Sequence, residues 1–399
     1  MTKPKLLFVG DTPTCPTGFA RVSDNVLRRL ADRWDITVLG INFFGDPYDR
    51  DRHPYPIYPA ASQGEIWGIG RFEAIAKYVK PDLALVLNDV WIVAHFAELR
   101  RDFPLACYTP VDAQNMHPSG AKALNKLGLA IFYTDFGLDE ARLAGFKGRS
   151  AVIPHGVDTS VYHPVDRREA RAMLGLDKLG NDAFIVGNVN RNQPRKRLDL
   201  SIEYFAKWVK EYSVPENVYL YLHCSQSDIG WDLPQLAHYW GIDHRLVVPG
   251  REVTSMTGLR EDVMKYVYGS FDLQISTTAG EGWGLSTIEG MACRIPQLAP
   301  DFAALGEWAR GAAALVPCDH LIATSGSRNT IAATPARDTF VQALDELYES
   351  PGMRARLAEE GYRRARERRF NWDTVADQFH GHLSALAEGK HEKAREAVA

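Results

Sequence analysis

A glycine-rich segment that ends in a short apolar run carries residues able to do chemistry. Residues 280–289 read GEGWGLSTIE, with glycines at three alternate positions and two glutamates. Such glycines let a backbone approach a ligand closely. A loop of this kind that opens a helix also offers free N–H groups and the positive end of the helix dipole, both of which suit a phosphate. The segment therefore predicts an anion site, beside which Glu281 and Glu289 can accept hydrogen bonds from sugar hydroxyls.

Structural interpretations of the same residues stay open. Ser286 and Glu289 have the spacing of a capping box, so Glu289 could serve only to open the helix. The glycines lack the spacing of the dinucleotide-binding fingerprint, because the last one falls one position early. Glu281 is an acid between two loop glycines and serves neither a core nor a cap, which makes it the stronger functional candidate.

A basic cluster is the second candidate. Arg191, Arg195, Lys196 and Arg197 follow a predicted strand and precede a predicted helix. Positive charge at a helix N-terminus opposes the helix dipole and therefore calls for a reason. Compensation of the charge of a diphosphate is one such reason, and a solvated basic helix start is the alternative.

Other candidates lie in loops that follow strands. Gly18, at the mouth of a helix predicted over 18–31, could let a phosphate approach or could only form a turn. Asp112 could bind the sugar or the acceptor, and a loop-capping aspartate is the alternative. Gly250 and Arg251 follow a further strand and are candidates for contact with a nucleotide.

Alternating strands and helices must position these residues. Apolar runs separated by helical patterns indicate βαβ units and mostly parallel, doubly wound sheets. In such sheets ligands bind at the carboxyl ends of the strands. The predicted fold class is therefore α/β, with two Rossmann-like domains and a ligand cleft between them. The first series of predicted strands covers 5–10, 36–40, 82–87, 105–108, 129–133 and 151–154, and the second covers 183–189, 218–223, 246–249 and 271–276.

Length and composition limit the function classes. A chain of 399 residues predicts two domains, here 1–165 and 166–370, connected through the polar stretch 163–182. The net charge of −4 provides no global basic field for nucleic acid or a membrane surface. No apolar run approaches membrane-spanning length, so we expect no stable membrane insertion. Five cysteines without a C-x-x-C pair favour reduced thiols in a cytoplasmic protein.

The glutamate pair also carries a family resemblance. Glu281 and Glu289, with their Gly-Trp-Gly-Leu interior, resemble the E-x7-E signature of retaining GT-B glycosyltransferases, and most closely family GT4 (glycosyltransferase group 1). The resemblance covers most of the chain and is strongest over 184–310. It extends to Lys196 and to the segments 154–158, 268–272 and 369–373.

The resemblance implies a GT-B architecture and a role for each charged group. Glu281 would hold hydroxyls of the donor sugar, Glu289 the ribose, and Lys196 with a neighbouring arginine the diphosphate. A final helix over about 371–399 would cross back onto the N-terminal domain. Residues and resemblance together give Glu281, Lys196 and Asp112 as catalytic candidates, and Glu289, Arg191, Arg195, Gly18, Gly250, Arg251, Gly282, Trp283, Gly284, Leu285, Ser286 and Thr287 as donor-binding candidates.

The predicted function is transfer of a sugar, with retention at the anomeric carbon, from a nucleotide sugar to a hydroxyl acceptor. A UDP- or GDP-sugar is the expected donor, and no tightly bound cofactor is expected. Because no carboxylate stands out as a nucleophile, the leaving phosphate is the expected base on a front-face route. The acceptor is a glycan, a small molecule or a hydroxymethylated DNA base, and the aromatic stretch 66–72 could face a glycan or a splayed base.

Two other functions and one rival motif complete the sequence interpretation. The chain could be a GT-B sugar-nucleotide epimerase, which converts its donor without an acceptor, or a non-catalytic relative that binds a sugar nucleotide or glycan. The intact glutamate pair and Lys196 argue against the second. The triplet Asp49-Arg50-Asp51 has the D-x-D pattern of the metal-binding GT-A class, but it lies in a proline- and arginine-rich loop without a strand signal. We therefore expect no catalytic metal.

Overall fold

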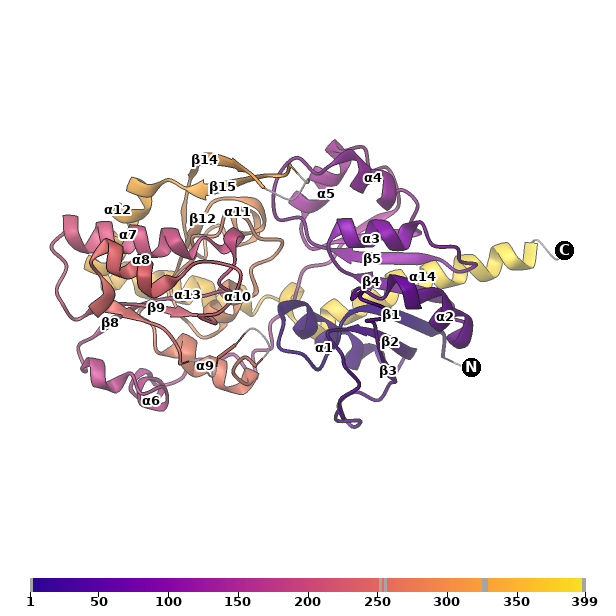
Figure 1. Ribbon diagram of the computed structural model, residues 1–399, viewed down its shortest axis with the longest axis horizontal. Helices are drawn as coiled ribbons and strands as arrows, with labels where there is room; N and C mark the ends of the chain where they lie inside the picture. The colour runs from indigo at the N-terminus through magenta and orange to yellow at the C-terminus, as the bar shows by residue number, and fades with distance from the viewer. Residues whose placement is uncertain (1–2, 251–252, 255–256, 325–328, 397–399) are drawn as a thin grey trace. The chain divides into compact units, whose positions relative to one another are not determined.

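Backbone contacts divide the chain into two compact units. The computed structural model describes residues 3–250, 253–254, 257–324 and 329–396. Unit 1 comprises 1–156, 326–330 and 369–399, and unit 2 comprises 157–325 and 331–368. Figure 1 shows the chain coloured along its length, and each unit has its own sheet and its own apolar core.

Unit 1 is built on a parallel sheet of seven strands in the order β3-β2-β1-β4-β5-β6-β7. The central strands are apolar on both faces because helices cover both, as expected for a parallel sheet. The sequence predicted these strands except the short β3. Their bounds are β1 (Lys5–Asp11), β2 (Asp35–Ile41), β3 (Ile57–Pro59), β4 (Leu83–Leu87), β5 (Leu105–Thr109), β6 (Leu129–Phe132) and β7 (Ser150–Val152).

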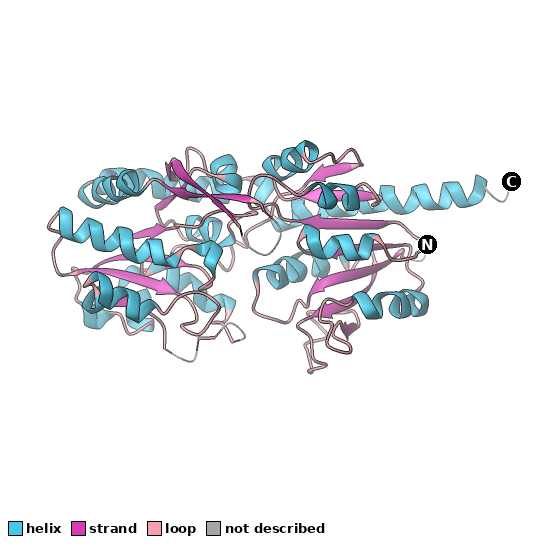
Figure 2. Cartoon of the chain, turned by 45° about the horizontal axis from the view of Figure 1, so that its top comes forward, coloured by secondary structure: helices cyan, strands magenta, loops and turns pink. Residues whose placement is uncertain are grey.

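Helices flank the unit 1 sheet on both sides, as Figure 2 shows. The predicted first helix forms, and the side chain of Thr17 caps it by accepting from the Ala20 N–H at 3.0 Å. The last helix packs against the first and against β4. The helices are α1 (Gly18–Leu30), α2 (Ile69–Val79), α3 (Val90–Ala97), α4 (Pro118–Leu124), α5 (Asp135–Leu143) and α14 (Trp372–Glu396).

Close packing joins two distant segments inside unit 1. A Cβ at Gly156 would lie 2.6 Å from the Trp372 ring, so only glycine fits there. The imidazole of His155 stacks on the same indole, with 6.2 Å between ring centroids. Burial lowers the pKa of His155 to about 3, so this histidine stays neutral. The segments 154–158 and 369–373, both singled out in the sequence, therefore meet at the point where the chain leaves and re-enters unit 1.

Unit 2 contains a six-stranded parallel sheet in the order β10-β9-β8-β11-β12-β13 and a separate antiparallel pair, β14-β15. The first four strands in sequence were predicted, whereas the last four were not. The strands are β8 (Phe184–Val189), β9 (Val218–His223), β10 (Leu246–Val247), β11 (Leu273–Ile275), β12 (Gln297–Pro300), β13 (Ala314–Val316), β14 (Cys318–Ala323) and β15 (Ile331–Pro335).

The stretch 163–182, predicted to connect the domains, is instead part of unit 2. It contains α6, and the buried Arg171 donates to Asp272 at 2.7 Å and to the Ser270 carbonyl at 3.1 Å. Arg167 and Arg171 of this stretch pair with Asp272, while most of its other charged residues are exposed. The helices of unit 2 are α6 (Arg167–Met173), α7 (Leu198–Glu211), α8 (Leu233–Trp240), α9 (Glu261–Gly269), α10 (Leu285–Ala292), α11 (Ala303–Trp308), α12 (Arg337–Glu349) and α13 (Pro351–Ala365).

Candidate active site

The glycine-rich loop runs from the carboxyl end of β11 to the N-terminus of α10. Gly284 adopts a left-handed conformation (φ 93°), and a Cβ there would lie 2.7 Å from the Leu305 side chain. Glycine is therefore required at this position for both backbone and packing reasons. The first turn of α10 contains no acidic residue and no side-chain cap. The Thr287 N–H donates to the Gly284 carbonyl at 3.1 Å, and the anion site at this turn stays a prediction.

The predicted capping box is wrong. Helix α10 begins at Leu285, directly after Gly284, so Ser286 already lies inside the first turn. Glu289 is buried and accepts a hydrogen bond from the Tyr268 hydroxyl at 2.6 Å. This contact spans 21 residues, and therefore the local spacing of Ser286 and Glu289 could not reveal it.

Glu281 lies against two cations of the basic cluster. Its Oε1 accepts from Lys196 Nζ at 2.5 Å, and its Oε2 accepts from Arg195 Nη1 at 3.2 Å. Burial alone would raise the pKa of Glu281, but the positive charges of Lys196 and Arg195 lower it to about 2. The buried carboxylate of Glu281 and the partly buried Lys196 and Arg195 form an ion-paired group just before α10, which we call the charge triad.

Backbone contacts hold the basic segment against the loop. Pro194–Lys196 form a short 3₁₀ turn, after which Arg197 takes a left-handed conformation (φ 50°). The Arg195 carbonyl accepts from the Ala279 N–H at 2.9 Å, and the guanidinium of Arg195 also donates to the Gly280 carbonyl. The positions of Arg195 and Lys196 are thus fixed by the loop that carries Glu281.

A buried hydroxyl network supports this arrangement and was missed in the sequence. Thr277 Oγ1 donates to the Arg197 carbonyl at 2.8 Å and lies 2.6 Å from Ser201 Oγ, which accepts from Asn188 Nδ2 at 3.0 Å. Asn190 Nδ2 in turn donates to Asn188 Oδ1 at 2.8 Å. Every member has a partner, so the network rigidifies the segment under the charge triad.

The rest of the loop and helix is fixed by close packing. Trp283 stacks on Trp308 with 5.1 Å between ring centroids, and Trp308 Nε1 donates to the Trp283 carbonyl at 2.8 Å. A Cβ at Gly290 would lie 1.8 Å from Gln274 Oε1, while Gln274 Nε2 donates to the Ser286 carbonyl at 2.9 Å. These contacts hold α10 tightly against the sheet.

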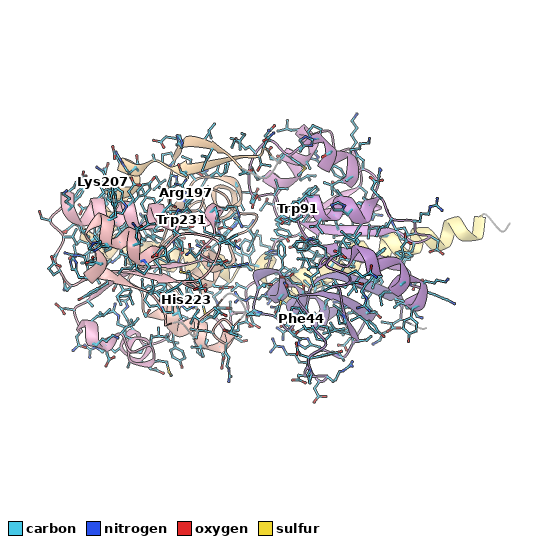
Figure 3. All side chains as sticks on the ribbon, in the orientation of Figure 1. Phe44, Trp91, Arg197, Lys207, His223 and Trp231 are labelled. Carbon is cyan, nitrogen blue, oxygen red and sulfur yellow. The ribbon has the colours of Figure 1, made fainter. Side chains whose placement is uncertain are left out.

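The other basic residues have different partners. Arg191 forms two hydrogen bonds of 3.0 and 3.1 Å with Asp228, and Arg197 pairs with Asp199 at 2.8 Å. Arg195 is therefore the arginine that lies beside Lys196 and Glu281. Figure 3 labels Arg197, which directly precedes α7, and Lys207, which lies within that helix.

The remaining candidate residues are dispersed. Gly18 begins α1 and Asp112 follows β5, both within unit 1, whereas the charge triad belongs to unit 2. Gly250 is exposed beyond β10, and Arg251 lies outside the described residues. Leu285, Ser286 and Thr287 form the first turn of α10, after Gly282 in the loop.

The described residues contain neither a cluster suited to a metal ion nor a helix suited to span a membrane. Across the part of the chain that the structure describes, no group of three or more His, Cys, Asp or Glu side chains is arranged to hold a metal ion. Among the same residues, every helix is too short or too polar to cross a membrane.

Sequence comparison relates the chain to curated proteins over part of their length. No protein-family model matches it. It is 29% identical over 234 residues to a D-inositol 3-phosphate glycosyltransferase of Rhodococcus jostii, covering 57% of this chain and 46% of the relative. It is 30% identical over 249 residues to the protein of the same name from Gordonia bronchialis, covering 61% and 47%. The chain spans about half the length of the curated relatives it matches.

Structural comparison covers nearly the whole chain. Sucrose-phosphate synthase from Thermosynechococcus elongatus aligns with a TM-score of 0.76 at 16% identity, covering 97% of this chain and 100% of that one. Anabaena HepE in complex with UDP-glucose aligns with a TM-score of 0.70 at 18% identity, covering 96% and 99%. At such identities the likeness shows a shared fold.

Proposed function

We propose that this chain, which has the GT-B fold and is related to glycosyltransferases, transfers a sugar from a nucleotide-sugar donor to a hydroxyl acceptor. The observation that carries the proposal is the charge triad of Glu281, Lys196 and Arg195 at the mouth of α10. The glycosyltransferase relatives and the nucleotide-bound structural neighbours support the same conclusion.

The charge balance of the triad suits a diphosphate. One carboxylate shared by two cations leaves one net positive charge, and the N-terminus of α10 adds positive potential. When the glycosidic bond breaks, negative charge develops on the leaving diphosphate. Lys196 and Arg195 are held in place before that charge appears, which is the most effective form of electrostatic stabilisation. They supply the charge that a metal provides in other sites.

The two glutamates have distinct roles in this proposal. A diphosphate that engages Lys196 and Arg195 frees oxygens of Glu281, which then accept hydrogen bonds from hydroxyls of the donor sugar. Glu289 is held by Tyr268 through one oxygen, and its carboxylate has further capacity to accept from a ribose. Gly282 and Gly284 to Thr287 contribute backbone N–H groups to the phosphates, and Gly250 and Arg251 contact the base.

We further propose a UDP-sugar donor and retention at the anomeric carbon. HepE was solved with UDP-glucose, which supports the choice of uracil over guanine for this chain. Retention rests on the E-x7-E resemblance, with the leaving phosphate as the base that accepts the acceptor's proton. Five unpaired cysteine thiols support a reducing compartment, and we assign the activity to the cytoplasm.

Thermal unfolding with nucleotides tests the proposal. A ligand that binds only the native state raises the melting temperature by mass action. UDP and UDP-glucose should raise the Tm of the wild-type chain, and GDP and ADP should raise it less. The variant Lys196→Met should lose the UDP shift, whereas the control Lys207→Met, which alters an exposed pair with Glu211 on α7, should keep it.

Three outcomes would contradict the proposal. If none of the nucleotides raises the Tm, the chain does not bind the proposed donor. Binding of UDP-glucose without release of UDP in the presence of any acceptor favours a non-catalytic binding protein. Conversion of UDP-glucose to an isomer without an acceptor, seen by NMR, favours an epimerase.

A further inference from the structure

The loops that follow three neighbouring strands of unit 2 begin side by side. Strands β10, β9 and β8 are adjacent in the parallel sheet, and Val189 at the end of β8 pairs with His223 at the end of β9. Parallel strands that lie next to one another bring the loops after them to one edge of the sheet. We call these loops the basic segment (190–197), the middle loop (224–232) and the base loop (248–250).

The side chain of Asn192 joins the basic segment to the middle loop. Its Nδ2 donates to the Trp231 carbonyl at 2.7 Å, and its Oδ1 accepts from the Trp231 N–H at 3.0 Å. Asn192 is 0% exposed, and Trp231 is labelled in Figure 3. The amide therefore pairs with both backbone groups of Trp231, as the backbone of a neighbouring strand would.

Two further contacts bring the same loops together. A Cβ at Gly230 would lie 2.0 Å from Asn192 Oδ1 and 2.7 Å from the Asn192 carbonyl oxygen, so only glycine permits this approach. Arg191 forms its two hydrogen bonds, of 3.0 and 3.1 Å, with Asp228 of the middle loop, whose side chain is buried. The basic segment and the middle loop are therefore held against each other.

The other end of the middle loop is bonded to the base loop. Gln226 Nε2 donates to the Pro249 carbonyl at 2.8 Å, directly before Gly250, for which a contact with the base is proposed above. Within the middle loop the Ser225 hydroxyl donates to the Ser227 carbonyl at 3.1 Å. A continuous series of hydrogen bonds thus runs from the basic segment through the middle loop to the base loop.

The charge triad itself is fixed from a different direction. The Arg195 carbonyl accepts from the Ala279 N–H at 2.9 Å, and Lys196 pairs with Glu281. Both contacts come from the segment before α10 and not from the middle loop. What the middle loop can set is therefore the position of the base loop relative to the charge triad.

We propose that Asn192 is a positioning residue, which through Trp231 and Gln226 holds the base loop at the distance from Lys196 that a nucleoside diphosphate spans. The inference rests on the proposed function and adds the residues that align the two halves of its donor site. A ligand that meets loops already aligned with each other loses less free energy to ordering when it binds. The nucleoside then adds its full contribution to the affinity of the diphosphate.

Two probes of different length test this proposal by calorimetry on the full chain. UDP is titrated directly and pyrophosphate in competition with UDP, since both reach Lys196 and Arg195 but only UDP reaches the base loop. Asn192→Leu, which keeps the branching at Cγ and adds no charge, should weaken UDP at least tenfold and pyrophosphate less than threefold. The control Asn217→Leu removes a donor to the Asp182 carbonyl just before β9, and it should change neither affinity.

A milder variant tests the far end of the same series. Gln226→Leu removes a single, partly buried hydrogen bond and should also weaken UDP more than pyrophosphate. Because the two contacts act in series, the double variant Asn192→Leu with Gln226→Leu should bind UDP within about threefold of the weaker single variant. Losses that multiply in the double variant would mean that the two side chains act independently, and the proposal would be overturned.

The remaining outcomes also decide the question. Equal weakening of UDP and pyrophosphate by Asn192→Leu would mean that Asn192 supports the diphosphate site alone. A lower Tm with both affinities unchanged would mean a purely structural role, and pyrophosphate that fails to compete with bound UDP would mean that the diphosphate half does not bind by itself. Each of these results overturns the inference and leaves the transferase proposal standing. A wild-type chain that does not bind UDP refutes both.

Discussion

The carboxyl edges of the two parallel sheets differ in how far their buried polar groups are hydrogen-bonded. In unit 2 the polar groups at this edge satisfy one another: Glu281 lies between Lys196 and Arg195, and a complete hydroxyl network underlies them. In unit 1 the corresponding edge contains buried groups without partners, such as Thr109 and Tyr133. The edge of unit 2 has charged groups that pair with one another, whereas the edge of unit 1 combines aspartates such as Asp11 and Asp89 with buried amide and hydroxyl groups that have no partner among the described residues.

This difference indicates what each edge can bind. A paired and net-positive site can exchange one internal carboxylate contact for a diphosphate at modest electrostatic cost. An edge with unsatisfied amide and hydroxyl groups gains most from a ligand that supplies hydrogen-bond partners. A doubly wound sheet supplies the place for a ligand, and the loop residues decide the chemistry.

Removal of the central carboxylate should have the largest effect. Glu281→Gln should lower the turnover of UDP-glucose about 10²–10³-fold, because a group aimed at the donor sugar is lost. Affinity for UDP should not fall, because the diphosphate no longer competes with a carboxylate for Lys196 and Arg195. Steady-state kinetics and calorimetry measure the two quantities separately.

The matched control is Glu211→Gln, which breaks the exposed pair with Lys207 on α7. It should leave both quantities unchanged. Loss of UDP affinity in Glu281→Gln with intact turnover would contradict the division of roles. Because Glu281 is buried between cations, the variant should also lose up to about 3 kcal/mol of unfolding free energy, in contrast to a carboxylate that serves catalysis alone.

Lower pH should reduce the free energy of unfolding of unit 2 through protonation of Glu281. The folded-state pKa of Glu281 is about 2, below its ordinary value of 4.5, because Lys196 and Arg195 stabilise its charge. Its contribution to stability is therefore complete above about pH 4.5 and is lost as the pH falls through about 2. Urea unfolding at pH 7, 4 and 3 should show a smaller decline for Glu281→Gln than for the wild type. Parallel declines would contradict the lowered pKa.

A pair of hydroxyl deletions compares the two edges directly, with smaller effects. Ser201→Ala should cost about 1–3 kcal/mol of unfolding free energy, because Asn188 Nδ2 loses its acceptor inside the complete network of unit 2. Thr109→Val should cost nothing or stabilise by about 1 kcal/mol, because its hydroxyl has no partner. Thermal or urea unfolding measures both. Equal costs for the two variants would mean that the edges do not differ in polar satisfaction.

Apolar periodicity sufficed for most of the fold. The ten predicted strands formed because their runs are apolar on both faces, which is typical of buried parallel strands. Strands β3, β12 and β13 were not predicted, although the equally short β7 and β11 were. The hairpin β14-β15 was missed because β14 is largely exposed and polar.

The candidate site could be predicted from the sequence only in part. Types and spacing identified Glu281 and Lys196, but their 2.5 Å contact joins residues 85 positions apart. The Tyr268–Glu289 bond is equally non-local and displaced the expected cap. In unit 1 the sequence singled out Gly18, Asp112 and the stretch 66–72 but not the unpaired hydroxyl of Thr109, since such a hydroxyl is defined by what surrounds it in space.

Calorimetric titration of UDP into three chains tests the central claim most directly, namely that the charge triad is a diphosphate site. The account predicts measurable binding to the wild type, at least tenfold weaker binding to Lys196→Met (about 1.4 kcal/mol or more), and wild-type binding to Lys207→Met. Equal affinity of Lys196→Met and the wild type for UDP would contradict it.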